Sequence, residues 1–347
     1  MRPQPEDVMA DPWRAALETY RPGPRAGSAP IKIRPSVETA GIEPLVEMAA
    51  WEALWAEPGA SVKTLADRFR ADRTARPSHL VSDAARRQSL AWIRRTLRDD
   101  RTRPFPPGIC VHGQDDYPEK LRDAVHPVEL LYYLGDWSLV FSDSVAVVGA
   151  RRISRNGRLR TRRVVQALVE AGRTIVSGLS AGVDTIAHKV CLEQRGRVIG
   201  VIATPLDEAC PPEILTVQTR IVRDHLLISQ VPFRRYGEQL ARTNVRTFVP
   251  ERDVTMSAVS DATIIVEVCD TSSTLHQART ALEQGRALFI LGSCFERTDL
   301  GWLARFEQQG AVRVDTINEL LDRLPAARTR SAKVAGSAIR GARSAAR

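Results

Sequence analysis

Aromatic residues are scarce in this chain, at 5% of its 347 residues. This scarcity argues against a protein that stacks every base of a nucleic acid on a ring. The five cysteines lie far apart without a C-x-x-C pair, so neither a disulfide framework nor a zinc site is expected. The chain also lacks a G-x-G-x-x-G turn, a P-loop lysine and a cluster of metal-ligating residues. We therefore expect no cofactor, and no nicotinamide chemistry, ATP hydrolysis or metal catalysis.

Long apolar runs are also missing. No stretch approaches the length of a membrane span, and the first residues, MRPQPEDVMADPWRAAL, lack the apolar centre of a signal peptide. These features predict a cytoplasmic protein without membrane contact.

Positive charge is in excess, with 50 Lys and Arg against 41 Asp and Glu and a formal net charge of +9. Such a balance favours nucleic acid or an acidic surface as a partner. Residues 325–347 contain six basic residues and no acid, so most of the excess lies in this tail. The body of the chain is only mildly basic, and local clusters of arginine matter more than the total.

The chain divides by composition into four parts. Residues 1–35 are rich in Pro, Arg and Gly and are expected to be a disordered leader, followed by a small helical domain over 36–103. Ser61–Arg70 could open a DNA-reading helix-turn-helix, but Pro77 falls where its recognition helix should begin or run, which favours plain helical packing. A larger domain is expected over 104–324, and a basic disordered tail over 325–347.

The larger domain alternates short apolar runs with amphipathic stretches. This alternation predicts parallel strands joined by right-handed helical crossovers, in a Rossmann-like, doubly wound, mostly parallel α/β sheet. The expected strands are 145–148, 174–176, 197–203, 226–231, 263–268, 287–291 and 312–314. The expected helices are 157–171, 183–194, 215–223, 254–259, 274–284, 302–309 and 317–324.

Two of these strands end in small-residue turns that open helices. The first ends at Gly149 and the second at Ser177-Gly178, with Gly182 at the start of the next helix. Unpaired backbone N–H groups at helix N-termini bind anions, so the two turns together predict a phosphate site. The alternative is an ordinary pair of turns in which glycine serves steric needs.

Seven arginines and no acid follow the first turn. Arg151 comes directly after the turn, where a guanidinium can pair two phosphate oxygens, and it is the strongest candidate for ligand contact. The more distal arginines fit a solvated helix face better. The cluster consists of Arg151, Arg152, Arg155, Arg158, Arg160, Arg162 and Arg163.

Other candidates lie further along the chain. Asp184 and His188 share one face of a helix directed at the sheet, and a structural role is favoured over a catalytic pair because no nucleophile is evident. Glu267 is expected to orient the neighbouring turns or an arginine. Arginines and the aromatic residues Phe233 and Tyr236 share a loop-rich segment, 232–250, which suits a single-strand groove. Phe248 in that segment fits core packing equally well.

Several ordered motifs over residues 108–324 resemble the DNA-processing protein A family (DprA, also called Smf). The most specific are SGLSAGVDTIAH (177–188) and TSSTLHQARTALEQGRALFILG (271–292). GARR after the first strand, PLDEACPPEI (205–214) and SAVSDATIIVEV (257–268) are similar to further family elements. The resemblance implies a Rossmann-like core that binds single-stranded DNA without catalysis, delivers it to the RecA recombinase, and forms a homodimer.

The chain also departs from the family pattern. The family's paired arginines appear as Arg252-Asp253-Val254, an expected arginine falls on Ala181, and Cys210 replaces a tyrosine. Arg252 remains a candidate phosphate ligand. The Ser-Gly-Ser turn becomes Ser272, Ser273 and Thr274, which can cap a helix and also bind phosphate. We expect a diverged member without the C-terminal winged helix.

Two alternatives remain open at this point. A nucleotide-binding sensor or an enzyme like the nucleotide phosphoribohydrolases would use the same sheet edge, although TSSTLHQA lacks the glycines of their signature. A structural paralogue would bind nucleic acid only through its basic tail.

Overall fold

The computed structural model describes residues 41–72, 74–98, 107–122, 128–206, 208, 211–240, 248–268, 272–297 and 300–326. The expected leader and nearly all of the expected basic tail lie outside these ranges. So does the expected domain boundary near residue 103. None of the helices in the described ranges is both long and apolar enough to cross a membrane.

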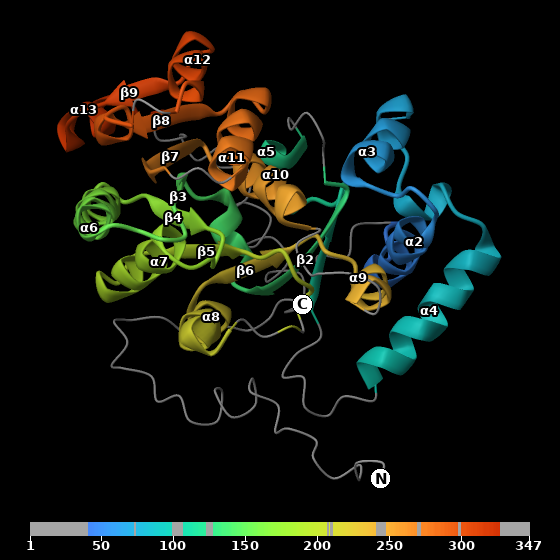
Figure 1. Ribbon diagram of the computed structural model, residues 1–347. Coiled ribbons are helices and arrows are strands. Elements are labelled where there is room, and N and C mark those ends of the chain that lie inside the picture. Colours follow the sequence, from blue (N-terminus) through green and yellow to red (C-terminus); the bar gives the residue numbers. More distant parts are fainter. Residues whose placement is uncertain are drawn as a thin grey trace, which may run out of the picture.

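A single mixed sheet organises the described residues (Figure 1). Its strand order is β1-β2-β6-β5-β4-β3-β7-β8-β9. The strands are β1 (Gly108–Val111), β2 (Leu130–Gly135), β3 (Ser144–Gly149), β4 (Thr174–Ser177), β5 (Val198–Val201), β6 (Leu226–Ser229), β7 (Ala262–Glu267), β8 (Ala287–Leu291) and β9 (Val312–Val314). From β6 through to β9 all neighbours are parallel, which confirms the Rossmann-like, mostly parallel sheet.

The edge formed by β1 and β2 was not predicted. β1 pairs antiparallel with β2, and β2 pairs antiparallel with β6, so two unpredicted antiparallel strands extend the predicted parallel part of the sheet at this edge. The two strands come before the βα alternation begins, the short helix Glu119–Arg122 lies between them, and they run antiparallel. Their pairing therefore needs no right-handed βαβ connection.

Helices cover both faces of the sheet. Alternate residues of β3 separate the two layers: Val145 and Val147 belong to one apolar cluster, and Ala146 and Val148 to the other. The first cluster includes α6 (Arg155–Glu170), α7 (Val183–Glu193), α8 (Pro212–Asp224) and α13 (Ile317–Arg323). The second includes α10 (Val249–Val259), α11 (Ser272–Glu283) and α12 (Trp302–Gln308).

The helices before the sheet are α2 (Pro44–Ala56), α3 (Val62–Ala71) and α4 (Asp83–Arg98). Ser61 caps α3, accepting a hydrogen bond from the backbone N–H of Thr64 at 3.1 Å. Helix α2 packs into the first apolar cluster together with β1 and β2. Its buried Glu52 accepts a hydrogen bond from the Tyr132 hydroxyl of β2 at 2.7 Å. The helical region thus shares a core with the sheet, and its division into a separate domain stays a prediction.

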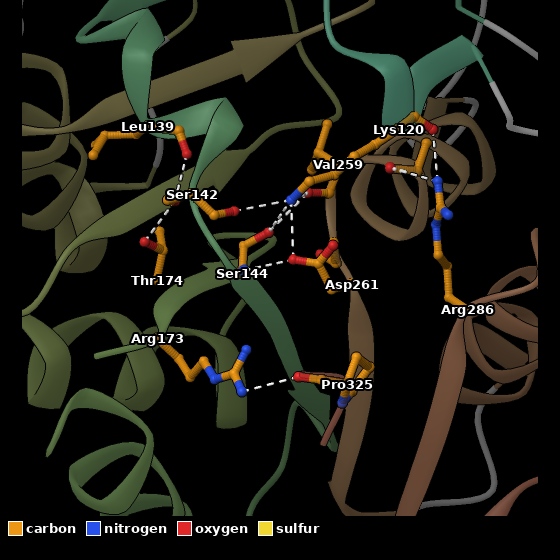
Figure 2. A network of polar contacts seen from close by, with 12 residues as sticks. Lys120, Leu139, Ser142, Ser144, Arg173, Thr174, Val259, Asp261, Arg286 and Pro325 are labelled. Carbon is orange, nitrogen blue, oxygen red and sulfur yellow. Dashed lines mark hydrogen bonds and ion pairs between the residues drawn. The ribbon is translucent and has the colours of Figure 1, made fainter. Parts of the chain in front are cut away.

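A buried ion pair ties the amino ends of two central strands to a short helix, α5 (Glu119–Arg122) (Figure 2). The Lys120 ammonium lies 3.0 Å from the carboxylate of Asp261, just before β7, and donates to the Ser144 hydroxyl of β3 at 3.1 Å. The same carboxylate accepts the backbone N–H of Ser144 at 2.8 Å. This network fixes the amino ends of β3 and β7 against each other.

Candidate nucleic-acid interface at the carboxyl edge of the sheet

The sheet reverses its winding direction at β3. From β3 the chain winds through β4, β5 and β6 on one side, and β7, β8 and β9 follow on the other side. Ligands of open α/β sheets bind at the carboxyl ends of the strands that flank such a switch point. Here these ends carry Gly149 of β3, Ser177 of β4 and Glu267 of β7.

The first turn, between β3 and α6, is held by Glu267. One carboxylate oxygen accepts the backbone N–H of Ser154 at 2.7 Å, and the other accepts the Ser154 hydroxyl at 2.6 Å. The Ser154 hydroxyl oxygen in turn caps α6 by accepting the N–H of Gly157 at 2.9 Å. Glu267 therefore orients this turn, as the sequence led us to expect, and a carboxylate already faces the N-terminus of α6. A phosphate is better accommodated beside this helix end than on its axis.

The arginines on the first turn and on α6 fall into two groups by their partners. Arg151, Arg152, Arg155 and Arg158 are exposed, and within the described ranges none has an acidic partner. Arg160 lies 3.8 Å from Glu267, and Arg162 pairs with Glu193 of α7 at 2.9 Å. The first four arginines thus keep their full charge available to an anionic ligand.

The second turn, between β4 and α7, lies directly against the first. The N–H of Val183 donates to the carbonyl of Ala150 at 3.2 Å. Gly182 has a φ of 84°, and a Cβ there would collide with that same carbonyl. Leu179 also adopts the left-handed region, with a φ of 51°, which is unusual for a branched residue. Glycine at 182 therefore serves both the backbone conformation and the close approach of the two turns.

The other small residues of this turn face the protein. The Ser177 hydroxyl donates to the carbonyl of Val147 at 2.7 Å, so its side chain is engaged inside the sheet. Gly178 is buried, and a Cβ there would collide with the guanidinium of Arg252. Phosphate contact at Ser177 and Gly178 stays a prediction, and it would have to use backbone N–H groups.

Arg252 is buried beneath the two turns. Its guanidinium donates to the carboxylate of Asp253 at 2.6 and 3.0 Å, and to the Ser180 hydroxyl at 2.9 Å. The Asp184 carboxylate lies 3.9 Å away. Burial raises the pKa of Asp184, against the lowering effect of the nearby arginine. Arg252 joins α10 to the second turn, and its expected phosphate contact stays a prediction.

A third helix end completes the edge. Ser272 and Ser273 open α11, and Thr274 is buried at the wall of a small polar pocket. Sequence reasoning missed two residues next to it: Gln277, which donates to the Ser257 hydroxyl at 2.7 Å, and His276, whose ring nitrogen lies 3.3 Å from Asp253. Both follow the predicted cap by one helical turn or less, and this spacing could have singled them out. The pocket is lined by Val148, Gly149, Arg151, Ser180, Asp184, Arg252, Asp253, Met256, Thr274 and Gln277.

His188 has no access to this pocket. It is fully buried under the sheet, and burial lowers its pKa to about 4, so the ring is neutral at pH 7. In the described ranges no three His, Cys, Asp or Glu side chains are grouped so that they could hold a metal ion.

The prediction of an aromatic groove over 232–250 is contradicted by the described parts of that segment, 232–240 and 248–250. Residues Phe233–Leu240 form helix α9, and Phe233, Tyr236 and Phe248 are all buried. In the core the Phe233 ring packs on Tyr132 of β2, with centroids 5.0 Å apart. The Phe248 ring lies between Tyr236 and Trp55 of α2, with centroid distances of 6.3 and 6.0 Å. These rings have no free face for a base. Arg242 and Arg246, also part of the expected groove, lie outside the described residues.

Comparison with known proteins supports the resemblance seen in the motifs. A family model described as DNA recombination-mediator protein A matches residues 108–325, which is more than half of the chain. The chain belongs to this family of DNA recombination mediators. The predicted resemblance is confirmed.

Relatives and solved structures agree with this assignment. Protein Smf of Synechocystis sp. is 34% identical over 224 residues, covering 63% of this chain and 54% of its own length. DNA processing protein DprA of Bacillus subtilis is 29% identical over 211 residues, covering 60% of this chain and 68% of its own length. The chain thus spans little more than half of the Synechocystis protein.

Two solved structures of similar proteins share the fold. DNA processing protein A from Streptococcus pneumoniae superposes with a TM-score of 0.60 at 24% identity, covering 81% of this chain and 96% of its own. A structure of DNA processing protein A from Helicobacter pylori, described for its single-stranded DNA binding mode, has a TM-score of 0.53 at 24% identity. The match covers 64% of this chain and 96% of the Helicobacter chain. These likenesses establish the common architecture.

Proposed function

We propose that this protein binds single-stranded DNA along the carboxyl edge of its sheet, chiefly through phosphates. The observation that carries the proposal is the group of four exposed arginines on the first turn and the start of α6, Arg151, Arg152, Arg155 and Arg158, which lack acidic partners in the described ranges. Phosphate contacts make binding strongly salt-dependent and nearly independent of sequence. Membership of a recombination-mediator family and the single-strand binding described for the Helicobacter protein support the choice of ligand.

Binding without chemistry fits the residues of the pocket. Its two carboxylates, Asp184 and Asp253, both lie against the guanidinium of Arg252, so neither is placed as an independent general base. We propose that the protein acts as a homodimer that delivers single strands to the RecA recombinase. This part rests on the family resemblance, and light scattering together with RecA filament assembly on coated single strands would test it.

The direct test is fluorescence anisotropy with a labelled oligothymidylate. Arg151→Ala should weaken binding by roughly tenfold or more, and each lost phosphate contact should flatten the salt slope by about 0.7. Arg162→Ala is the matched control, because Arg162 lies on α6, the helix that follows the first turn, but pairs with Glu193. If the two substitutions weaken binding equally, the proposed site is wrong. If Arg151→Ala binds the oligonucleotide as tightly as the wild type does, the DNA must bind elsewhere on the protein.

A mononucleotide ligand is the second candidate. It is favoured by the small, open polar pocket between the starts of α7 and α11, with Thr274 and Gln277 on its wall. A competition experiment separates the two functions. If a mononucleotide displaces the oligonucleotide only at the high concentration expected of a single unit of the DNA, the DNA function is supported. Displacement at far lower concentration supports a nucleotide sensor.

A further inference from the structure

Helix α4 presents an unusual stripe of side chains. Gln88, Ala91, Trp92 and Arg95 recur at the spacing of one helix face and line an open groove of about 420 Å³. Arg234 of α9 forms its opposite wall. A volume of this order lies within the range of about 300–1,000 Å³ seen for ligand sites.

The groove combines an aromatic ring with positive charge. Trp92 is half-buried and packs against the core on one side, while its remaining surface faces the groove. Arg95 is exposed and has no acidic partner in the part of the chain that the structure describes. The sequence of α4 contains five arginines and one acid, Asp83, which pairs with Arg86 at 2.8 Å. An aromatic ring can stack on a base, and the positive charge beside it can pair with the phosphates of the same strand.

The opposite wall is fixed by a buried carboxylate. Glu52 of α2 is fully buried and accepts the backbone N–H groups of Phe233 and Arg234, each at 3.0 Å. These hydrogen bonds hold the first turn of α9 against α2, and α4 packs on the same helix (Figure 1). The groove is therefore part of a rigid arrangement and does not depend on a loop.

The groove lies along the same side of the sheet as the proposed DNA site. Helix α9 follows the carboxyl end of β6, and β6 is separated from β3 by β5 and β4. Neighbouring strands are about 4.8 Å apart, so the ends of β3 and β6 are roughly 14 Å apart. A single strand that leaves the first turn and runs along this edge reaches α9 and then α4.

We propose that the groove between α4 and α9 is a second contact site for single-stranded DNA, in which a base stacks on Trp92 and Arg95 pairs with a phosphate. The proposal rests on the single-strand binding proposed above and extends it to the helical region. It predicts that the second site contributes only to strands long enough to span both sites.

The test compares oligothymidylates of about 6 and about 20 nucleotides, lengths that bracket common single-strand site sizes. Trp92→Leu keeps an apolar side chain but removes the ring, and it should weaken binding of the long strand by about 5-fold to 100-fold while leaving the short strand unchanged. Trp92→Phe should restore most of the loss, because a ring is present again. Arg95→Ala should weaken long-strand binding a few-fold and flatten its salt slope by about 0.7, whereas Arg305→Ala, an exposed arginine on α12, should not.

The outcomes separate this inference from the function on which it rests. If Arg151→Ala weakens binding of both strands while Trp92→Leu changes neither, the groove is not a DNA site and the proposed function stands. If Arg151→Ala has no effect on the short strand, the proposed edge site itself fails. If Trp92→Leu weakens long-strand binding and Trp92→Phe does not restore it, the base does not stack on the ring and Trp92 has a packing role. Circular dichroism of each variant shows whether the fold is intact.

Discussion

Glu267 holds Ser154 by two hydrogen bonds, one from the backbone N–H at 2.7 Å and one from the hydroxyl at 2.6 Å. The contact joins the end of β7 to the turn after β3, so one carboxylate fixes the loop that carries Arg151 and Arg152. The same carboxylate places negative charge beside the N-terminus of α6, where a Cβ on Gly157 would collide with it. Glu267 thus organises the proposed DNA site while opposing the charge of its ligand.

Glu267→Gln should separate these two effects. Replacing charged with neutral hydrogen bonds should lower the free energy of unfolding by about 1 kcal/mol. Loss of the negative charge should raise single-strand affinity a few-fold at low salt, with the gain disappearing at high salt. Urea unfolding and anisotropy measure the two effects. Glu193→Gln, which removes a carboxylate paired with Arg162, is the control for charge alone. A fall in affinity at low salt would mean that orientation of the turn outweighs charge.

The contact between the two turns gives a second prediction. Gly182→Ala places a side chain at a φ of 84° and against the carbonyl of Ala150, so it should lower the free energy of unfolding by about 2–4 kcal/mol. It should also weaken DNA binding, because the first turn must shift. Gly172→Ala is the matched control: its φ is 73°, but nothing lies within 4 Å of the added Cβ. The control should cost only about 1 kcal/mol in urea unfolding. Equal losses in the two variants would show that the turns do not press on each other.

The central sheet could be predicted because its signals are local. Each strand from β3 to β9 is a short apolar run that ends at a turn, and each crossover helix has its own amphipathic pattern. β1 and β2 are short apolar runs as well, but they lie before the alternation of strands and helices, and no local pattern predicts the antiparallel pairing that joins Gly108 to Tyr133. Helix α9 was missed for a related reason. Gly237 lies in its interior, and the Glu52 carboxylate that caps it is 181 residues away from Phe233 in the sequence.

The site was predictable in its position more than in its contacts. The turns after β3 and β4 and the arginines that follow them could be read from the sequence, because glycine and helix starts mark a switch point. The partners of the charged residues could not. Glu267 and Ser154 are 113 residues apart, and no sequence pattern connects them. Arg252 is different, because its partner Asp253 is the next residue and could have been recognised as an internal counter-ion.

At the amino edge of the sheet, the Lys120–Asp261 pair gives a third prediction. Lys120→Met leaves a buried carboxylate without its cation and should lower the free energy of unfolding by about 3–5 kcal/mol. The double variant Lys120→Met/Asp261→Asn removes the uncompensated charge and should recover part of that loss. Urea unfolding of the single and double variants measures the difference. DNA binding at temperatures where both remain folded should be unchanged, because the pair lies at the edge opposite to the proposed site. A double variant less stable than the single one would show that the Asp261 bond to Ser144 matters more than the charge.

Two histidines, the fully buried His188 and the partly buried His225, make stability depend on pH in a predictable direction. Burial lowers the pKa of His188 and that of His225 to about 4, below the usual value of 6.5. Between these values the unfolded chain binds more protons than the folded one, so stability is greatest above pH 6.5 and falls as the pH decreases towards 4. Each histidine should contribute a loss on the order of 3 kcal/mol over that window.

The variant His188→Leu isolates one of these contributions. It removes a titrating group while leaving His225 in place, so the difference in stability between wild type and variant should change with pH, in favour of the variant as the pH falls. Urea unfolding at pH 7, 6, 5 and about 4.5 measures this difference. A difference that stays constant over the series would mean that His188 takes up its proton over the same pH range in the folded and unfolded chains, which its burial beneath the sheet opposes. The direction in which the stability difference changes with pH therefore tests whether the packed interior under β4 keeps His188 neutral.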